Sequence, residues 1–376
     1  MTTSTIQKDS EANAAVNPEL AAIAERVMDI RASFFDHLDS LPEPFASIVK
    51  EHYLERVVRA ESRQMLGEYA PFLLADVLRV SDVSAVLRIA VPWLVLYEHA
   101  LLVDDIVDGK SPNWRERFFA SQVLYDDFLD TWKDCFVTHP ELWLAFRRYH
   151  EQAMFSALRE AKEDSAIHAE TESLSAGSPG HHMAMGRKAA LVKFCGAALL
   201  VENKGQVLRG IEESGIDKLC AGIQLLDDLC DCVEDHGEGR FTYPVRQALL
   251  QVEHQFGLLL RSDLNRSDIG MFDVVVSSGV VGQVARLSRE YLSAGVSDLG
   301  ITAGSDTGQF LGSLIGRCAE TDLETQCLYA NSGAEINDLF NAAVEGHVSE
   351  LVAIPPYDAV WRHLLRQFTR IATAAN

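Results

Sequence analysis

Two aspartate-rich clusters, about 120 residues apart, are the residues whose type and spacing point most directly to chemistry. The first is DDIVD at 104–108 and the second is DDLCD at 227–231. On a helix, residues four positions apart share a face, so each cluster stacks its carboxylates. Buried carboxylates repel one another unless cations bind between them. Oxygen ligands without His or Cys at ligand spacing favour Mg²⁺ over zinc. Two such clusters facing one cavity predict a multi-metal site for a diphosphate.

An acidic cluster on a helix can instead be part of a charged, solvent-exposed surface. The residues before each cluster are mostly apolar for about two turns, LYEHALLV before the first and AGIQLL before the second. Such sequence is typical of buried helices and not of a charged surface. The metal–diphosphate interpretation is therefore favoured over two solvated faces.

Apolar residues at three- and four-residue spacing dominate the chain and predict an all-α fold of roughly a dozen helices. Only FDVVVSS at 272–278 is typical of a strand. We expect residues 1–17 to be a disordered tail and 18–376 to form a single helical domain. His181 and His182 stand in a Ser- and Gly-rich stretch, so we expect them to be solvent-exposed.

The composition limits the kinds of molecule that the protein is expected to bind. The chain has 376 residues, 48% of them apolar, and a net charge of −22. This charge disfavours nucleic acid and anionic membranes as partners, but bound Mg²⁺ would still permit an anionic substrate. Seven cysteines without a CxxC pair, and no N-terminal apolar segment, predict a cytoplasmic protein with free thiols. The apolar run at 89–103 is interrupted by Glu98 and His99 and is expected to be too short to span a bilayer.

From about residue 60 to 250, the chain resembles the trans-polyprenyl diphosphate synthases and their relatives with the class I isoprenoid synthase fold, because its motifs occur in the same order. That fold is a helical bundle with a deep central cavity. The similar segments are LYEHALLVDDIVD, SQVLYDDFLD with Asp127, GRKAALVKFCGAAL with Lys188, GIQLLDDLCD with Gln224, and GRFTYP with Arg240. Five matches in the same order are more specific than any single one.

The resemblance implies which carboxylates bind metal. Asp104 and Asp108 would bind two Mg²⁺ ions, and Asp227 with Asp231 would bind a third. Asp104, Asp108 and Asp227 are the catalytic candidates. Asp235 extends the second cluster at the spacing of a terpene cyclase metal motif. Its position beside a glycine favours a surface acid at a helix end.

The resemblance also implies substrate contacts. Lys188 and Arg240 would hold the allylic diphosphate of the substrate, and Gln224 would line the same site. His99, five residues before the first cluster, stands where the family has the floor of its pocket. It is either a cavity wall or a hydrogen-bonded core histidine, and the sequence favours neither.

One segment departs from the family and bears on the reaction. Chain-elongating members bind isopentenyl diphosphate with a basic segment that aligns with MLGEYAPFLL. Here Gly67, Glu68 and Ala70 occupy the basic positions, and a glutamate would repel a second diphosphate. The threonine of the Lys-Thr motif is Ala189. The half of the site for the allylic diphosphate is kept, whereas the half for isopentenyl diphosphate is lost.

This asymmetry predicts a class I terpene synthase, which ionises one prenyl diphosphate of ten to twenty carbons. The cation would then cyclise or lose a proton. Three alternatives stay open. The protein could be a prenyltransferase with another acceptor, such as an indole or a sugar lipid. It could elongate chains through a rebuilt site that uses Arg63, Lys110 or Arg115. It could also be a non-catalytic partner subunit. A homodimer is the family's usual state.

Overall fold

The computed structural model of the protein describes residues 21–59, 66–109, 111, 113–166, 182–183, 186–256 and 270–375. Within these residues the regular elements are 15 α-helices and one short 3₁₀ helix, and no strand occurs. The predicted all-α fold is confirmed. The predicted tail at 1–17 lies outside the described residues and stays a prediction.

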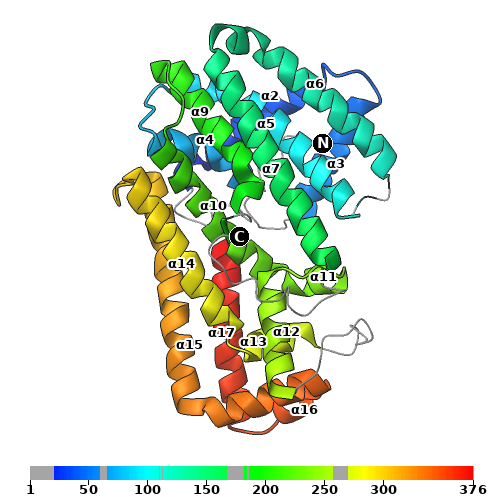
Figure 1. The fold of residues 1–376 in the computed structure, drawn as a ribbon, viewed down its shortest axis with the longest axis vertical. Coiled ribbons are helices and arrows are strands. Elements are labelled where there is room, and N and C mark those ends of the chain that lie inside the picture. The colour runs from blue at the N-terminus through cyan, green and yellow to red at the C-terminus, as the bar shows by residue number, and fades with distance from the viewer. Residues whose placement is uncertain are drawn as a thin grey trace.

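The helices form two halves that are stacked along the long axis of the molecule (Figure 1). The N-terminal half contains α2 (Ala21–Leu38), α3 (Phe45–Arg59), α4 (Leu66–Val77), α5 (Val83–Val107), α6 (Trp114–Thr138), α7 (Pro140–Ala166), η3 (Arg187–Ala190) and α9 (Leu191–Lys204). The C-terminal half contains α10 (Gly210–Cys230), α11 (Cys232–Gly237), α12 (Tyr243–Phe256), α13 (Met271–Ser277), α14 (Val280–Leu299), α15 (Asp306–Glu345), α16 (Val348–Leu351) and α17 (Tyr357–Ala375).

Helix α5 lies at the centre of the N-terminal half. Asp82 begins it by accepting a hydrogen bond from the Ser84 backbone amide at 2.9 Å. The helix has 25 residues and is long and apolar enough to cross a membrane, so the prediction that this stretch is too short is wrong. However, 56% of its apolar window is buried inside the protein. This burial is typical of a core helix.

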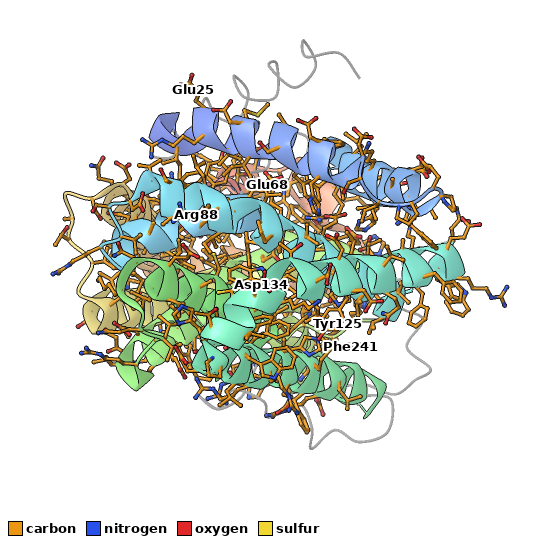
Figure 2. All side chains as sticks on the ribbon, turned by 90° about the horizontal axis from the view of Figure 1, so that it is seen from above. Glu25, Glu68, Arg88, Tyr125, Asp134 and Phe241 are labelled. Carbon is orange, nitrogen blue, oxygen red and sulfur yellow. The ribbon has the colours of Figure 1, made fainter. Side chains whose placement is uncertain are left out.

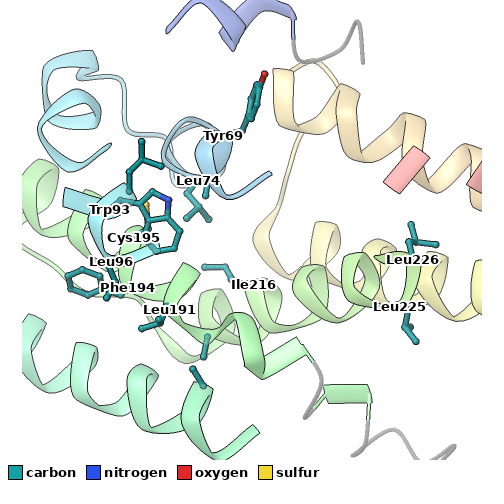
Figure 3. Packing of buried hydrophobic residues seen from close by; sticks show 14 of the residues in the cluster. Tyr69, Leu74, Trp93, Leu96, Leu191, Phe194, Cys195, Ile216, Leu225 and Leu226 are labelled. Atoms are coloured by element: carbon teal, nitrogen blue, oxygen red, sulfur yellow. The ribbon is translucent and has the colours of Figure 1, made fainter. Parts of the chain in front are cut away.

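Aromatic side chains form the core between α6, α7 and α9. Phe128 and Phe146 lie with their ring centroids 5.1 Å apart, and Phe194 of α9 lies 5.0 Å from Phe146. Trp132 packs edge-on against Phe194. Phe194 and Trp93 of the central helix α5 belong to the same buried hydrophobic cluster (Figure 3). Large rings contribute much buried area, so this part of the fold is densely packed.

The C-terminal half is built around a close crossing of α10 and α14. A side chain at Gly222 would lie 2.7 Å from Leu292, and one at Gly295 would lie 2.8 Å from Leu219. The Ser288 hydroxyl donates to the Gly222 carbonyl at 2.8 Å. Small residues therefore let the two helix backbones approach each other and fix where α10 lies.

The segment predicted to be a strand forms the short helix α13. Val274 and Val275 are fully buried there. β-Branched residues favour strands only weakly, and tertiary packing overrides that preference. The prediction of a strand at 272–278 is therefore wrong.

Polar contacts at several places join the halves. At the start of α15, Thr307 donates through its backbone amide to Asp76 at 2.9 Å. On the other side, the buried Lys193 of α9 forms an ion pair with Asp217 of α10 at 2.6 Å. Helix α10 therefore enters the C-terminal half from a fixed point on the N-terminal half.

The last helix returns toward the middle of the molecule. Helix α17 packs along α10 and α15, and its end lies near α10 and α11 (Figure 1). The Cys230 thiol donates to the Ala372 carbonyl at 3.9 Å. The end of α17 is thus in contact with the end of α10.

Candidate functional site

The first acidic cluster lies at the C-terminal end of α5. Asp104 and Asp105 are in its last turn, and Asp108 caps it, with the Asp108 amide bonded to the Asp104 carbonyl at 2.9 Å. All three side chains are half-buried. The C-terminal end of a helix carries partial negative charge and disfavours carboxylates, and this last turn has no basic residue. The cluster is therefore a place where cations are strongly favoured.

A buried histidine lies behind this cluster. His52 of α3 contacts Glu98 at 2.5 Å through Nδ1 and Asp105 at 3.0 Å through Nε2. Burial opposes its charged form, but the hydrogen bonds to Asp105 and Glu98 raise the pKa of His52 above its usual value. An ionised carboxylate only accepts hydrogen bonds, so two ionised partners favour a ring in which both nitrogens are protonated.

Sequence reasoning missed this group. His52 and Glu98 are 46 residues apart in the chain, and His52 lies outside the five similar segments. One signal was present, because Glu98 is a single acid within an otherwise apolar run. A buried acid needs a partner, but the sequence does not say which.

The second cluster lies at the junction of α10 and α11. Asp227 is exposed, whereas Asp228 is buried and accepts a hydrogen bond from Gln224 at 2.8 Å. Helix α10 ends at Cys230, and Asp231 forms the junction between the two helices. Backbone bonds continue with four-residue spacing through this junction, from Asp231 to Asp227 and from Asp235 to Asp231. Asp227, Asp231 and Asp235 are therefore one turn apart along the chain.

Arg240 brings the two clusters together. Its guanidinium forms an ion pair with Asp108 of the first cluster, and also with Asp235 at 2.7 Å and Glu238 at 2.6 Å. Burial opposes its charge, but Asp235 and Asp108 raise the pKa of Arg240. Asp235 is only 4% exposed. The prediction that Asp235 is a surface acid is therefore wrong, because it is buried against this arginine.

Lys188 lies on η3, which packs against α7 and α10. The approach is close, since a side chain at Gly186 would lie 2.7 Å from the Asp217 carbonyl and from the Ala221 amide. This contact lies one turn before Gln224 on α10. Lys188 is half-buried beside the helix that carries the second cluster. Its contact with substrate stays a prediction.

His99 faces α6. It is buried, and its Nδ1 donates to the Ser121 carbonyl at 2.9 Å. Burial lowers the pKa of His99 to about 4, so the ring is neutral. Its ring lies 5.0 Å from Tyr125, at the edge of the aromatic core. Of the two interpretations that the sequence left open, the hydrogen-bonded core histidine fits these contacts.

One histidine was misplaced by the sequence. His182 was expected to be exposed, but it is 3% exposed and packs edge-on against Tyr243 at 4.8 Å and Tyr291 at 5.8 Å. Burial lowers its pKa. The prediction for His182 is wrong, because rings from α12 and α14 enclose it. His181 lies outside the described residues.

The donor set around Arg240 fits divalent cations that are shared with a diphosphate. Across the described parts of the chain, no three His, Cys, Asp or Glu side chains by themselves form a complete metal site. Mg²⁺ commonly binds through one or two carboxylates and takes its other ligands from water and substrate phosphates. Asp104 with Asp108, and Asp227 with Asp231, are pairs of this kind. The oxygen-only donors suit a hard cation.

The position aligned with the second diphosphate site is occupied by an internal ion pair. Glu68 is buried and accepts hydrogen bonds from Arg31 at 3.0 and 2.5 Å and from the Tyr53 hydroxyl. In Figure 2, Glu68 lies beneath α2 within the N-terminal half, whereas Glu25 of α2 points outward. Glu68 is therefore already neutralised within the protein.

Two basic residues after the first cluster, Arg115 and Arg117, have other contacts within the described part of the chain. Arg117 is buried, lies 2.6 Å from Glu55 and is directed into the protein. Arg115 lies over the Trp114 ring at 5.2 Å. Arg63 and Lys110, which the elongation alternative also invoked, lie outside the described residues.

A pocket of about 230 Å³ lies away from the acidic clusters. It is formed where α2, α4 and the starts of α5 and α15 meet, with Arg26, Asp76 and Asp306 among its lining residues. It contains none of the predicted site residues. The predicted deep cavity at the clusters therefore stays a prediction.

Comparison with solved structures identifies the fold. A polyprenyl synthase from Caulobacter crescentus CB15, complexed with calcium and isoprenyl diphosphate, superposes with a TM-score of 0.57. The match has 14% identity and covers 79% of this chain and 95% of that one. The protein has the polyprenyl synthase fold. A geranylgeranyl pyrophosphate synthase from Corynebacterium glutamicum matches with a TM-score of 0.54 and 13% identity, over 82% of this chain and 98% of that one.

No protein-family model and no curated protein matches the chain by sequence. The polyprenyl synthase fold was nevertheless predicted from five short segments, and the solved structures confirm it. At these identities the likeness establishes the fold alone. The residues of this chain's own site are the basis for the reaction proposed below.

Proposed function

We propose that this protein is a class I terpene synthase that acts on one prenyl diphosphate of ten to twenty carbons. The allylic carbon–oxygen bond breaks, and its electron pair leaves with the diphosphate. The cation then closes a ring or loses a proton. The support is the position of Arg240, which pairs with Asp108 of the first cluster and with Asp235, one turn after Asp231 of the second cluster.

Each side chain has a defined part in this proposal. Asp104 and Asp108 on one side, and Asp227 and Asp231 on the other, would hold about three Mg²⁺ ions, which when bound neutralise the departing diphosphate. Arg240 would turn from its carboxylate partners toward the diphosphate. Such a turn would exchange one set of charge-assisted hydrogen bonds for another.

Lys188 of η3 lies beside α10, which carries Gln224, and both side chains would orient the diphosphate. Aromatic side chains lie beyond His99, with Tyr125 and Phe128 stacked 6.5 Å apart. In the cavity that this proposal requires, they would exclude water and their faces would stabilise a cation.

The observation that favours a single substrate is the buried ion pair of Glu68. A second diphosphate needs basic side chains, but this position holds a carboxylate that Arg31 and Tyr53 already neutralise. Turning Arg31 toward a ligand would leave a buried carboxylate unpaired, which costs about 3–5 kcal/mol. This arrangement supports ionisation without elongation.

Prenyl transfer is the second candidate, and the comparisons favour it. The two solved structures described above are named a polyprenyl synthase and a geranylgeranyl pyrophosphate synthase. An acceptor without a diphosphate, such as an indole or a sugar lipid, would need no second basic site. This form of transfer is compatible with the ion pair of Glu68.

One experiment separates the candidates. The protein is incubated with Mg²⁺ and geranyl, farnesyl or geranylgeranyl diphosphate, with and without isopentenyl diphosphate, and volatile and diphosphate products are analysed. A hydrocarbon or alcohol from one substrate alone supports the terpene synthase. Longer diphosphates that form only with isopentenyl diphosphate would refute it and support elongation. No turnover in any mixture would favour another acceptor or a partner subunit.

The expected homodimer and cytoplasmic location remain part of this proposal. Val137 of α6 and Leu144 and Phe155 of α7 are strongly exposed apolar side chains. A second copy of the chain that covered them would remove apolar surface from water. Sedimentation of the purified protein tests the dimer, because a monomer at all concentrations would contradict it.

A further inference from the structure

His52 links the first cluster to α3. It is fully buried on α3 and contacts Glu98 and Asp105, both on α5. These two acids are seven residues apart, which places them two turns apart on the same face of the helix. The histidine therefore joins α3 to the last two turns of α5.

Asp105 has cationic partners on two sides. Arg117 of α6 lies 3.9 Å from its carboxylate and is itself held by Glu55 of α3 at 2.6 Å. Asp105 is thus directed between α3 and α6. Since each residue turns a helix by about 100°, Asp104 and Asp108 then share a different face.

The other end of the link is equally fixed. Glu98 is buried and accepts a second hydrogen bond from Arg56 of α3 at 2.9 Å. Two residues of one turn of α3, His52 and Arg56, therefore hold the same carboxylate. The end of α5 has no freedom to rotate without breaking these bonds.

A gain in stability alone does not explain why these charged side chains are buried together. A buried set of charges is often no more stable than apolar side chains of the same volume. This set, however, lies directly behind the carboxylates that the proposed function uses. Outer partners of metal ligands commonly fix ligand orientation, and losing them lowers metal affinity about 10- to 100-fold.

We propose that His52 is a positioning residue for the first cluster. By holding Asp105 and Glu98 it fixes the end of α5, so that Asp104 and Asp108 present their carboxylates to a divalent cation bound with a diphosphate. This inference rests on the proposed function. It adds a residue on α3, far from both motifs in sequence, to the parts that the site requires.

The test measures metal binding without turnover. Thermal unfolding of the wild type, His52→Gln and His37→Gln is followed with inorganic pyrophosphate over a Mg²⁺ series. His37 is the matched control, because it contacts Asp127 at 2.7 Å away from the clusters. We expect His52→Gln to raise the half-saturating Mg²⁺ concentration at least tenfold and His37→Gln to leave it unchanged. Tm without ligand is read separately.

The outcomes are distinct. A lower ligand-free Tm with an unchanged Mg²⁺ dependence in His52→Gln would make the histidine merely structural and overturn the inference. If His52→Gln does not fold, Asp105→Asn carries the test and must show the same shift. If both variants fold, the double variant should need no more Mg²⁺ for half-saturation than either single variant. If the two effects on the half-saturating Mg²⁺ concentration are additive, the inference is overturned. A wild type without any response to Mg²⁺ and pyrophosphate would refute the proposed function itself.

Discussion

The first acidic cluster is held from behind by side chains of two other helices, whereas the second is held along its own helix and by the loop that follows it. Asp105 contacts His52 of α3 and lies near Arg117 of α6. Asp228 is bonded instead to Gln224, one turn earlier on α10. The geometry of the first cluster therefore depends on tertiary contacts, and that of the second on where α10 lies.

The strongest test of this comparison removes one carboxylate from each cluster. We expect Asp104→Asn and Asp227→Asn each to lower turnover about a thousandfold, or about 4 kcal/mol, because each ligand supports a charge on the leaving group. Steady-state kinetics measure this. Asp130→Asn is the control, because Asp130 is exposed and its ion pair with Lys133, at 3.8 Å, lies at the surface of α6. Normal rates in either cluster variant would contradict the metal assignment.

Arg240 joins the clusters, so Arg240→Gln should affect both. We expect the KM for a prenyl diphosphate to rise about thirtyfold, since a charge-assisted contact contributes about 2 kcal/mol. Arg88→Gln serves as the control, because Arg88 forms an exposed ion pair with Glu202 at 2.9 Å. An unchanged KM in Arg240→Gln would mean that the arginine only joins the two halves.

The position of α10 can be tested by a substitution where it crosses α14. Gly222→Ala should destabilise the fold by about 1–3 kcal/mol, because the new methyl group would lie 2.7 Å from Leu292. Gly312→Ala on α15 is the control, since nothing lies within 4 Å of that position. Urea unfolding gives the free energies. A neutral Gly222→Ala would show that α14 does not fix α10.

The smallest expected effect concerns Gln224. Gln224→Leu removes its bond to Asp228 and should weaken Mg²⁺ binding about fivefold, or about 1 kcal/mol. The chain offers a matched control in Gln326→Leu, because Gln326 donates to Asp322 at 2.8 Å with the same spacing on α15. Titration calorimetry with Mg²⁺ and pyrophosphate separates the two. Equal responses would place Gln224 outside the site.

The sequence was sufficient for features that depend on neighbouring residues. Apolar spacing predicted the helices, and short segments placed both clusters at helix ends. The strand-like 272–278 was misassigned because Val274 and Val275 are buried in a helix by distant partners. Local propensity does not contain that information.

Features that depend on distant contacts could not be read from the chain. His52 meets Asp105 across 53 residues, and Arg31 meets Glu68 across 37. Glu68 was read correctly as a departure from a basic segment, but its partners were not predicted. Asp235 was placed at the surface because its arginine partner is supplied by a loop beyond the helix end. Such pairings become visible only when the helices are packed.

The contact between the ends of α17 and α10 has a practical consequence for work with this protein. The Ala372 carbonyl accepts from Cys230, and Cys230 is the direct neighbour of Asp231. A purification tag or fluorescent fusion attached after α17 would follow closely on Ala372, which contacts the end of α10 next to the second cluster. A polyhistidine tag there would bring imidazoles next to the carboxylates that Mg²⁺ would use. Assays of this protein are therefore best made with its C-terminal end unmodified, and a label on Cys230 would report on the same place.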